Sequence, residues 1–132
     1  MPIKRTLALS ALFVLLLVPS AFAGNAAPSY VELTDAPTIT VDWSKGNTQT
    51  VTLGGNRTFT FLNGQKGGKY LLILKQDSHG SRLVTWPLSV RWPGPTQTAA
   101  PPTLTTTANK TDYLTFFFNG VTYDGLGLSQ NY

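Results

Sequence analysis

Residues 38–62 read TITVDWSKGNTQTVTLGGNRTFTFL, and this stretch decides the fold. Apolar side chains alternate with threonine and other polar residues in three short runs, at 38–43, 49–53 and 57–62. A period of two places the apolar side chains of a strand on one face and the polar ones on the other. Gly54-Gly55-Asn56 is a turn signal between the second and third runs. The stretch therefore predicts half-buried β-strands separated by turns.

The same pattern continues toward the C-terminus. Residues 69–76, KYLLILKQ, are apolar at successive positions from Tyr70 to Leu74, which predicts a central strand covered on both faces. Asn119-Gly120 is a hairpin signal. Further runs with strand character lie at 81–86, 88–92 and 111–118.

Short strands with turn signals between them predict an all-β domain, a single antiparallel β-sandwich of the jelly-roll type with about eight strands. No stretch has the apolar period of a helix. The inward-facing positions of the strands predict the hydrophobic core. Its expected members are Val41, Trp43, Val51, Leu53, Phe59, Phe61, Leu72, Leu74, Val84, Val90, Leu114, Phe116 and Phe118.

The N-terminus carries the three-part pattern of a secretory signal peptide. Lys4 and Arg5 give a basic start, and residues 7–18 are apolar apart from one serine. Ala21-Phe22-Ala23 then forms an A-x-A cleavage site. A retained membrane anchor is the alternative, but the apolar run is shorter than the ~20 residues that a bilayer core requires. The sequence predicts a signal peptide at 1–23, a flexible leader or first strand at 24–37, and a β-sandwich domain at 38–132.

The composition excludes several kinds of site. The chain contains no cysteine, which excludes a thiol nucleophile, a thiolate metal site and a lipid-modified cysteine. Removal of residues 1–23 lowers the net charge from +4 to +2, because two of the ten basic residues and none of the six acidic ones lie there. The other basic residues are scattered singly, whereas a nucleic-acid-binding protein normally clusters them. We therefore expect no nucleic-acid partner.

Asp77, Ser78 and His79 stand side by side and have the residue types of a hydrolase triad. The side chains of a triad must converge, whereas neighbouring residues of a strand or turn point apart. Asp and Ser are favoured in turns because they bond nearby backbone amides, and Gly80 suits such a turn. We interpret the segment as a hairpin tip, in which His79 is a candidate pH-sensitive surface contact.

The carboxylates form no recognisable catalytic or metal-binding pattern. One Glu and five Asp are spread from Glu32 to Asp124, and no two have the arrangement of a glycosidase pair. No Asp-rich calcium loop is present, although scattered carboxylates and carbonyl groups leave a calcium site open. The sequence therefore predicts a non-enzymatic protein with no metal or cofactor.

The aromatic residues offer the best candidates for a binding site. Trp43, Trp86 and Trp92 lie at or near strand ends, where core packing is the simplest interpretation for any one of them. The alternative is a sugar platform, in which an exposed aromatic face stacks on sugar C–H groups while polar neighbours supply hydrogen bonds. The candidate ligand-binding residues are Trp86, Trp92, Tyr113, Tyr123 and His79.

Four pieces of the chain resemble, in this order, a C-terminal β-rich module that is common in phage tail-fibre and other virion-surface proteins. They are ITVDWSKGNTQTVTLGGNRTFTF (39–61), YLLILKQDSHGSRLVTWP (70–87), PPTLTTTANKTDYLTFFFNGVTYDG (101–125) and LSQNY (128–132). The family's usual hairpin, LKQDGTGSRTVTW, has glycine in place of Ser78 and threonine in place of His79, which speaks against a catalytic role for either. The loop at 93–102 is longer and richer in proline than usual. The signal peptide is a larger departure, because fibre modules are ordinarily parts of longer proteins assembled in the cytoplasm.

Two functions follow as expectations. The first is a secreted, non-enzymatic binding module, tail-fibre-like, for a surface glycan or a cell-surface receptor. The second is a structural subunit of an extracellular filament, pilus-like fibre or coat, in which residues 24–35 add a strand to the sheet edge of a neighbour. Either protein would act in the periplasm, at the cell surface or outside the cell, with no membrane span after signal cleavage.

Overall fold

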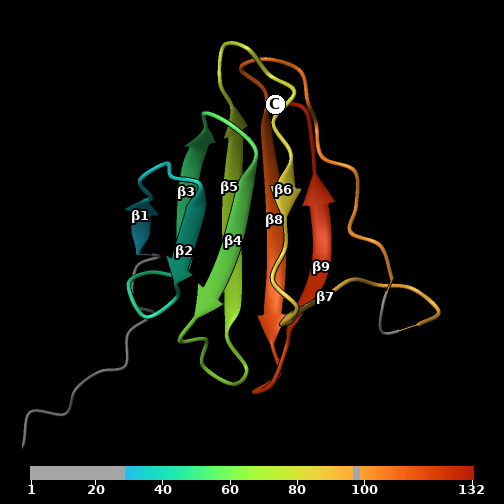
Figure 1. The fold of residues 1–132 in the computed structure, drawn as a ribbon. Helices are drawn as coiled ribbons and strands as arrows, with labels where there is room; N and C mark the ends of the chain where they lie inside the picture. Colours follow the sequence, from blue (N-terminus) through green and yellow to red (C-terminus); the bar gives the residue numbers. More distant parts are fainter. Residues whose placement is uncertain (1–28, 97–98) are drawn as a thin grey trace, which may run out of the picture.

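Nine strands and no helix make up residues 29–96 and 99–132, the part of the chain that the computed structural model describes (Figure 1). Those residues contain no helix that is long and apolar enough to cross a membrane. The predicted signal peptide at 1–23 lies outside the described residues, whereas the all-β prediction is confirmed. The strands are β1 (Tyr30–Glu32), β2 (Thr38–Asp42), β3 (Thr48–Leu53), β4 (Arg57–Leu62), β5 (Lys69–Gln76), β6 (Val84–Thr85), β7 (Val90–Arg91), β8 (Thr111–Phe118) and β9 (Tyr123–Ser129).

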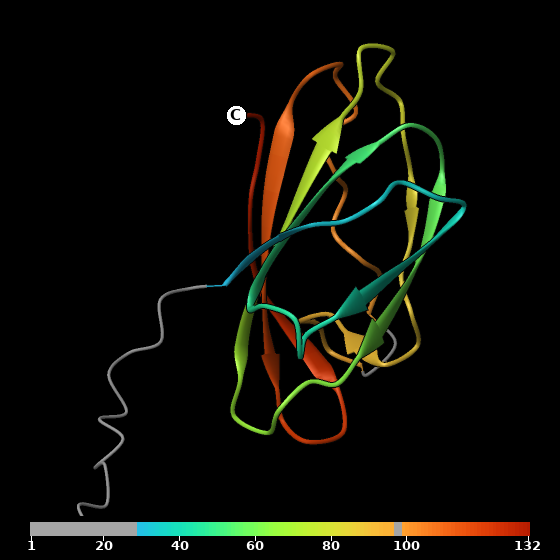
Figure 2. The ribbon, with the colours of Figure 1, turned by 90° about the vertical axis from the view of Figure 1, so that its left-hand side faces the viewer.

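The first six strands alternate between two sheets that face each other (Figure 2). One sheet has six strands in the order β1-β3-β5-β8-β9-β7, and the other has three in the order β2-β4-β6. Within each sheet the strands from β1 to β6 are parallel to their neighbours, so that Thr38 lies opposite Thr58 and Thr58 opposite Thr85. The chain therefore winds as a coil, and each turn of the coil adds one strand to each sheet.

The prediction of an antiparallel jelly roll is wrong, because five of the seven strand pairings are parallel. Alternation of apolar and polar residues gives a strand the same two faces whichever way its neighbour runs, so the pattern did not distinguish the two cases. The turn at 77–80 leads from β5 into β6 of the other sheet and is not the tip of a hairpin. The hairpin predicted at Asn119-Gly120 does form, between the antiparallel strands β8 and β9.

The hydrophobic core lies between the two sheets and follows the predicted parity of the strands. Phe61 is central, with the rings of Trp43, Phe116 and Tyr123 edge-on at 5.4, 5.3 and 5.2 Å between centroids. Edge-to-face packing is the favoured geometry for such pairs. Most of the predicted core is buried, Val84 and Phe118 pack against it half-buried, and three further residues join it. These three are Ile39, Tyr70 and Tyr123.

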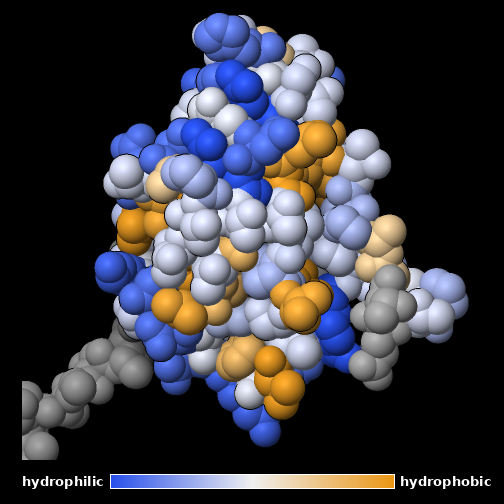
Figure 3. Space-filling model, in the orientation of Figure 1, coloured by the Kyte–Doolittle hydropathy of each residue, from blue (hydrophilic) through white to orange (hydrophobic). Residues whose placement is uncertain are grey.

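The strand β5 is internal to the six-stranded sheet, as predicted, but it is covered on one face only. Leu72 and Leu74 are buried between the sheets, whereas Leu71 and Ile73 on the outer face are half-buried. The outer face of the three-stranded sheet is different in kind. Its surface is mostly of near-neutral hydropathy (Figure 3), because most of its outward positions are threonines, namely Thr38, Thr40, Thr58, Thr60 and Thr85.

Candidate binding site at the tryptophan pair

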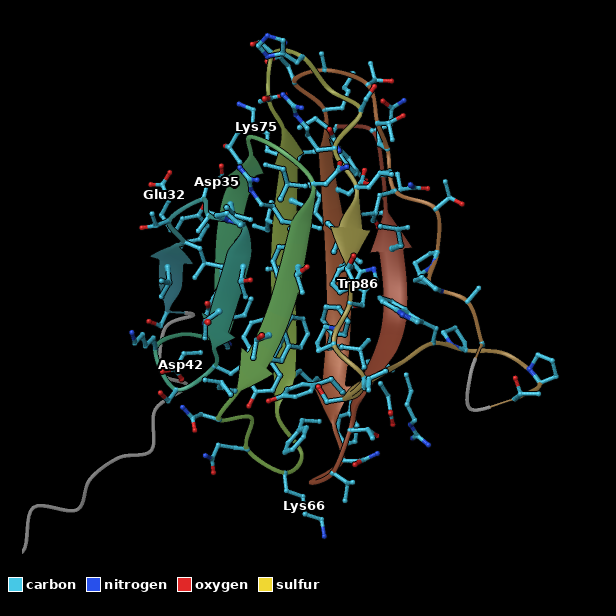
Figure 4. The ribbon with its side chains drawn as sticks, viewed as in Figure 1. Glu32, Asp35, Asp42, Lys66, Lys75 and Trp86 are labelled. Carbon is cyan, nitrogen blue, oxygen red and sulfur yellow. The ribbon has the colours of Figure 1, made fainter. Side chains whose placement is uncertain are left out.

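The fold brings Trp86 and Trp92 together at the end of the coil. Trp86 is labelled in Figure 4, where it lies at the end of β6. Trp86 follows β6 and Trp92 follows β7, so the two rings come from different sheets. Their centroids are 5.1 Å apart, and buried Phe116 lies 6.0 and 5.7 Å from them. Both rings are half-buried, which leaves part of each exposed above a packed base. The pair is therefore held in place by the core and is accessible from outside.

Three adjoining hollows surround the tryptophan pair. Trp92 and Pro93 line one of ≈ 350 Å³ together with Arg91, and a second of ≈ 230 Å³ together with Leu126 and other residues. A third, of ≈ 260 Å³, is lined by Trp86 and shares Pro102 with the second. Small-molecule sites are concave surfaces with aromatic walls and a few polar groups, and the hollows together have this character.

Gly125 fixes the position of the Trp92 ring. A Cβ atom built on Gly125 would lie 2.5 Å from Cε3 of Trp92, which is closer than side chains approach. Only a glycine lets the indole ring lie directly on the β9 backbone at this position. The exposed face of Trp92 is therefore set by a strand backbone on one side and by the ring of Trp86 on another.

A charged pair forms the polar rim of the first hollow. The guanidinium of Arg91 donates from Nε to Oδ1 of Asp124 at 2.7 Å and from Nη2 to Oδ2 at 2.8 Å. Thr122 and Asn119 also donate to this carboxylate, at 3.0 and 3.2 Å. The hydrogen bond from Arg91 is the main reason that the pKa of Asp124 is lowered. Both groups are ionised at neutral pH, and their charges cancel locally.

The other predicted ligand-binding residues lie away from this pair. Tyr123 is only 3% exposed, because it faces inward beside Phe118, and its hydroxyl accepts a bond from the Gly64 amide at 2.9 Å. Burial raises the pKa of Tyr123, and its ring is not available to a ligand. Tyr113 lies on the outer face of the six-stranded sheet, against Tyr132. His79 is exposed on the turn after β5.

The arrangement around Asp77 does not form a triad. Its carboxylate accepts bonds from Arg82 Nε at 3.1 Å and Nη2 at 2.7 Å, and from the amides of His79 and Gly80 at 3.0 Å each. Arg82 is the main cause that lowers the pKa of Asp77 to about 2. This carboxylate braces the turn. Within residues 29–96 and 99–132, no group of three or more acidic or histidine side chains is placed to hold a metal ion.

Acid should weaken the contribution of Asp77 to stability. Because the pKa is lower in the folded chain than the ordinary 3.8, this contribution is complete above about pH 4 and is lost as the pH falls toward 2. Asp77→Asn should therefore melt below the wild type at pH 5, and most of this difference should be lost when the pH has fallen to 2. Thermal melts across this range measure it, with the adjacent Ser78→Ala as a control that should follow the wild type. A difference that persists unchanged at pH 2 would contradict the assignment.

Sequence reasoning missed three of the residues that shape the site. The alternation in 88–92 indicates an outward strand residue at Arg91, and the sequence Tyr-Asp-Gly indicates a turn at Asp124. Nothing in the sequence links these two positions, which are 33 residues apart. Gly125 carried a usable signal, because a glycine inside a strand often marks the close approach of another group. The sequence Gly125-Leu126-Gly127 lies within β9. Thr115 pairs with Gly127 and Phe116 with Gly125, so Leu126 is the extra residue of a bulge in β9.

Comparison with known protein families gives a match. A family model described as "Putative phage tail fibre C-terminal domain" matches residues 34–123, which include both tryptophans and Arg91. No curated protein and no solved structure matches the chain.

Proposed function

The chain belongs to the phage tail fibre C-terminal domain family, and from this premise we propose that it is a non-enzymatic module that binds a neutral surface glycan at the tryptophan pair. Membership of this family indicates a structural or binding role at the virion surface. The observation that carries the finer proposal is the fixed, partly exposed Trp92 ring beside the Arg91–Asp124 pair. An aromatic face next to planar polar side chains is the combination that sugar recognition requires.

The paired charges favour a neutral ligand over an acidic one. Arg91 is the basic residue that lines the first hollow, and its Nε and Nη2 atoms both donate to the carboxylate of Asp124. An acidic sugar would have to compete with that carboxylate for the guanidinium. A neutral sugar can instead accept from the edge of the guanidinium and donate to the carboxylate, with both charges still compensated.

The absence of catalysis is part of the proposal. Asp77 and Asp124 are each engaged by an arginine, and Asp35 is held by Arg57 at 2.6 Å, so these carboxylates act as braces in the fold. Lowered pKa values keep all three ionised, whereas a general acid needs a raised pKa.

Export is also part of the proposal, and its support is the leader sequence at 1–23. The protein recovered from the periplasm or medium should have the intact mass of a chain that begins at Gly24. A chain that keeps Met1 and stays with the cytoplasm would exclude export.

A glycan array tests the function directly. The purified chain should bind a small set of neutral glycans, and the signal should fall for Trp92→Ala. A folded chain that binds nothing on a broad array would count against glycan recognition, and binding only to sialylated or sulfated glycans would overturn the preference for neutral ligands.

A further inference from the structure

At the side where the coil begins, the six-stranded sheet extends further than the three-stranded sheet that faces it (Figure 1). β1 is the edge of the six-stranded sheet and β2 the edge of the three-stranded one. In Figure 1, β1 projects beyond β2, so that no strand of the smaller sheet covers it. Val31 and Leu33, which have the inward parity, are half-buried there. The inner face of β1 therefore lacks the strand that covers the inner faces of β3 and β5.

A hollow of ≈ 380 Å³ lies at this place. Val31 and Leu33 line it from the β1 side, Thr40 and Asp42 from the edge of β2, and Gln49 from β3. Nε2 of Gln49 donates to the carbonyl oxygens of Asp42 at 2.7 Å and Gly46 at 3.0 Å, which closes the interior beneath the hollow. We call this hollow the edge socket. Val31 and Leu33 form its apolar floor, Glu32, Thr34 and Lys45 add polar and charged groups around that floor, and the edge of β2 forms one wall.

The main chain of β2 presents free hydrogen-bonding groups to the edge socket. Pro37 O accepts from Thr58 N, and Trp43 N donates to Leu62 O, so the odd-numbered residues of this stretch face β4. In a parallel ladder the alternate residues face the other way. The N–H and C=O groups of Thr38 and Thr40 therefore point away from the sheet. Edge strands commonly carry a lysine, a proline or a bulge. β2 itself contains none of these, although Pro37 directly precedes it and Lys45 lines the socket.

The opposite end of the coil is protected. The segment 101–106 lines the hollow beside Val84 and Trp86, so it covers the far edge of the small sheet at β6. Pro87 and Pro93 follow β6 and β7 closely and cannot donate ladder bonds. The coil is capped at one end and open at the other.

The exported chain cannot fill the edge socket from its own sequence. In the coil, Thr38 of β2 pairs with Thr58 of β4, which is 20 residues later in the chain. A strand on the other edge of β2 with the same spacing would have to come from residues 18–22, VPSAF. These residues lie in the predicted signal peptide and include a proline. After cleavage only residues 24–29 precede β1, and the turns between the sheets, such as 63–68, use about that length themselves.

We propose that the edge socket accepts an extended strand from another polypeptide, which pairs with β2 and covers Val31 and Leu33. The occupant is a segment with apolar side chains at alternate positions, as in β4. Its main chain bonds Thr38 and Thr40, and its apolar side chains replace water on the floor of the socket. This inference rests on the proposed export, because cleavage removes the residues that would otherwise occupy the position. It is independent of glycan binding, since Asp42 belongs to β2 and Trp86 follows β6, and these strands are the two opposite edges of the three-stranded sheet (Figure 4).

A peptide with the sequence of residues 55–63, GNRTFTFLN, serves as the probe, because β4 already pairs with the other edge of β2. The purified chain, with its N-terminus read from the intact mass, should raise the fluorescence anisotropy of the labelled peptide in a saturable way. Thr40→Pro should weaken binding at least tenfold, because it removes an N–H that faces the socket. The substitution leaves the hydrogen bonds between β2 and β4 in place, since the Thr40 N–H does not face β4. Thr60→Val, on the neighbouring strand, should bind as the wild type does.

Val31→Asp provides a second test in case Thr40→Pro does not fold, because it puts a charge on the socket floor without changing the β2 backbone. Circular dichroism and thermal melts confirm that each variant is folded. A folded wild type beginning at Gly24 that does not bind the peptide overturns the proposal, as does equal binding by folded Thr40→Pro. If the wild type dimerises and the dimer does not bind the peptide, a second copy of the chain occupies the socket, and this result also overturns the proposal. An intact mass that includes residues 1–23 shows instead that the premise of export has failed.

Discussion

Phe116→Ala is expected to lower the free energy of unfolding by about 4 kcal/mol and the melting temperature by about 20 °C. Phe116 is fully buried, and its ring packs against Phe61, Trp86 and Trp92. Truncation removes the transfer free energy of the ring and leaves a cavity that its aromatic neighbours cannot close without losing their own packing. Urea unfolding followed by tryptophan fluorescence measures the loss.

The neighbouring residue gives a matched control. Phe117 lies one position along β8 and points to the outer face, where it is half-buried. Phe117→Ala should cost less, about 1.5 kcal/mol, because part of that ring already faces water and its loss leaves no cavity between the sheets. Since a slip of one residue exchanges the two faces of a strand, equal losses in the two variants would contradict the pairing of Phe116 with Tyr70.

The existence of the strands was predictable from the sequence, and their pairing was not. The alternation in a run such as TITVD predicts which side chains face the core, and Ile39 and Val41 are buried as it predicts. Whether a strand such as β3 pairs with the next strand in the chain or with the one after it depends on whether the turn that follows stays in the same sheet or crosses to the other one. The turn at 54–56 crosses to the other sheet, and its Gly-Gly-Asn sequence is equally compatible with a hairpin.

Tyr123 illustrates a second limit. It is one of the candidate ligand-binding aromatic residues of the sequence, and the structure buries it. The bulge in the pairing of β8 and β9 near Phe116 sets which residues of β9 face inward, and Tyr123 comes to lie opposite Phe118. A bulge is a three-dimensional feature that a period of two in one strand does not reveal.

The candidate site was predictable only in its aromatic part. Trp86 and Trp92 were identified as possible platforms, and the structure brings these two together. Their polar neighbour Asp124 arrives from the far end of the chain through the pairing of β7 with β9. Because that pairing is parallel and joins strands more than 30 residues apart, no local pattern announces it.

Trp92→Ala is expected to weaken binding of the glycan that gives the strongest array signal by about thirtyfold, or about 2 kcal/mol. The exposed face of this ring is the aromatic surface that the site offers to a sugar beside Arg91 and Asp124, and alanine leaves no ring in its place. Isothermal titration measures the change. Tyr113→Ala removes another half-exposed ring, from the outer face of the six-stranded sheet, and should bind as the wild type does.

Gly125→Ala separates the position of the Trp92 ring from its chemistry. The added methyl group would lie 2.5 Å from Cε3 of Trp92, so the ring must move away from β9 although every side chain of the site is still present. Binding should therefore fall nearly as far as in Trp92→Ala, with a shift in tryptophan fluorescence that reports the displaced ring. If Gly125→Ala binds normally while Trp92→Ala does not, the ring acts only as apolar surface and its fixed orientation is unnecessary. If Tyr113→Ala alone loses binding, the glycan lies on the outer face of the large sheet.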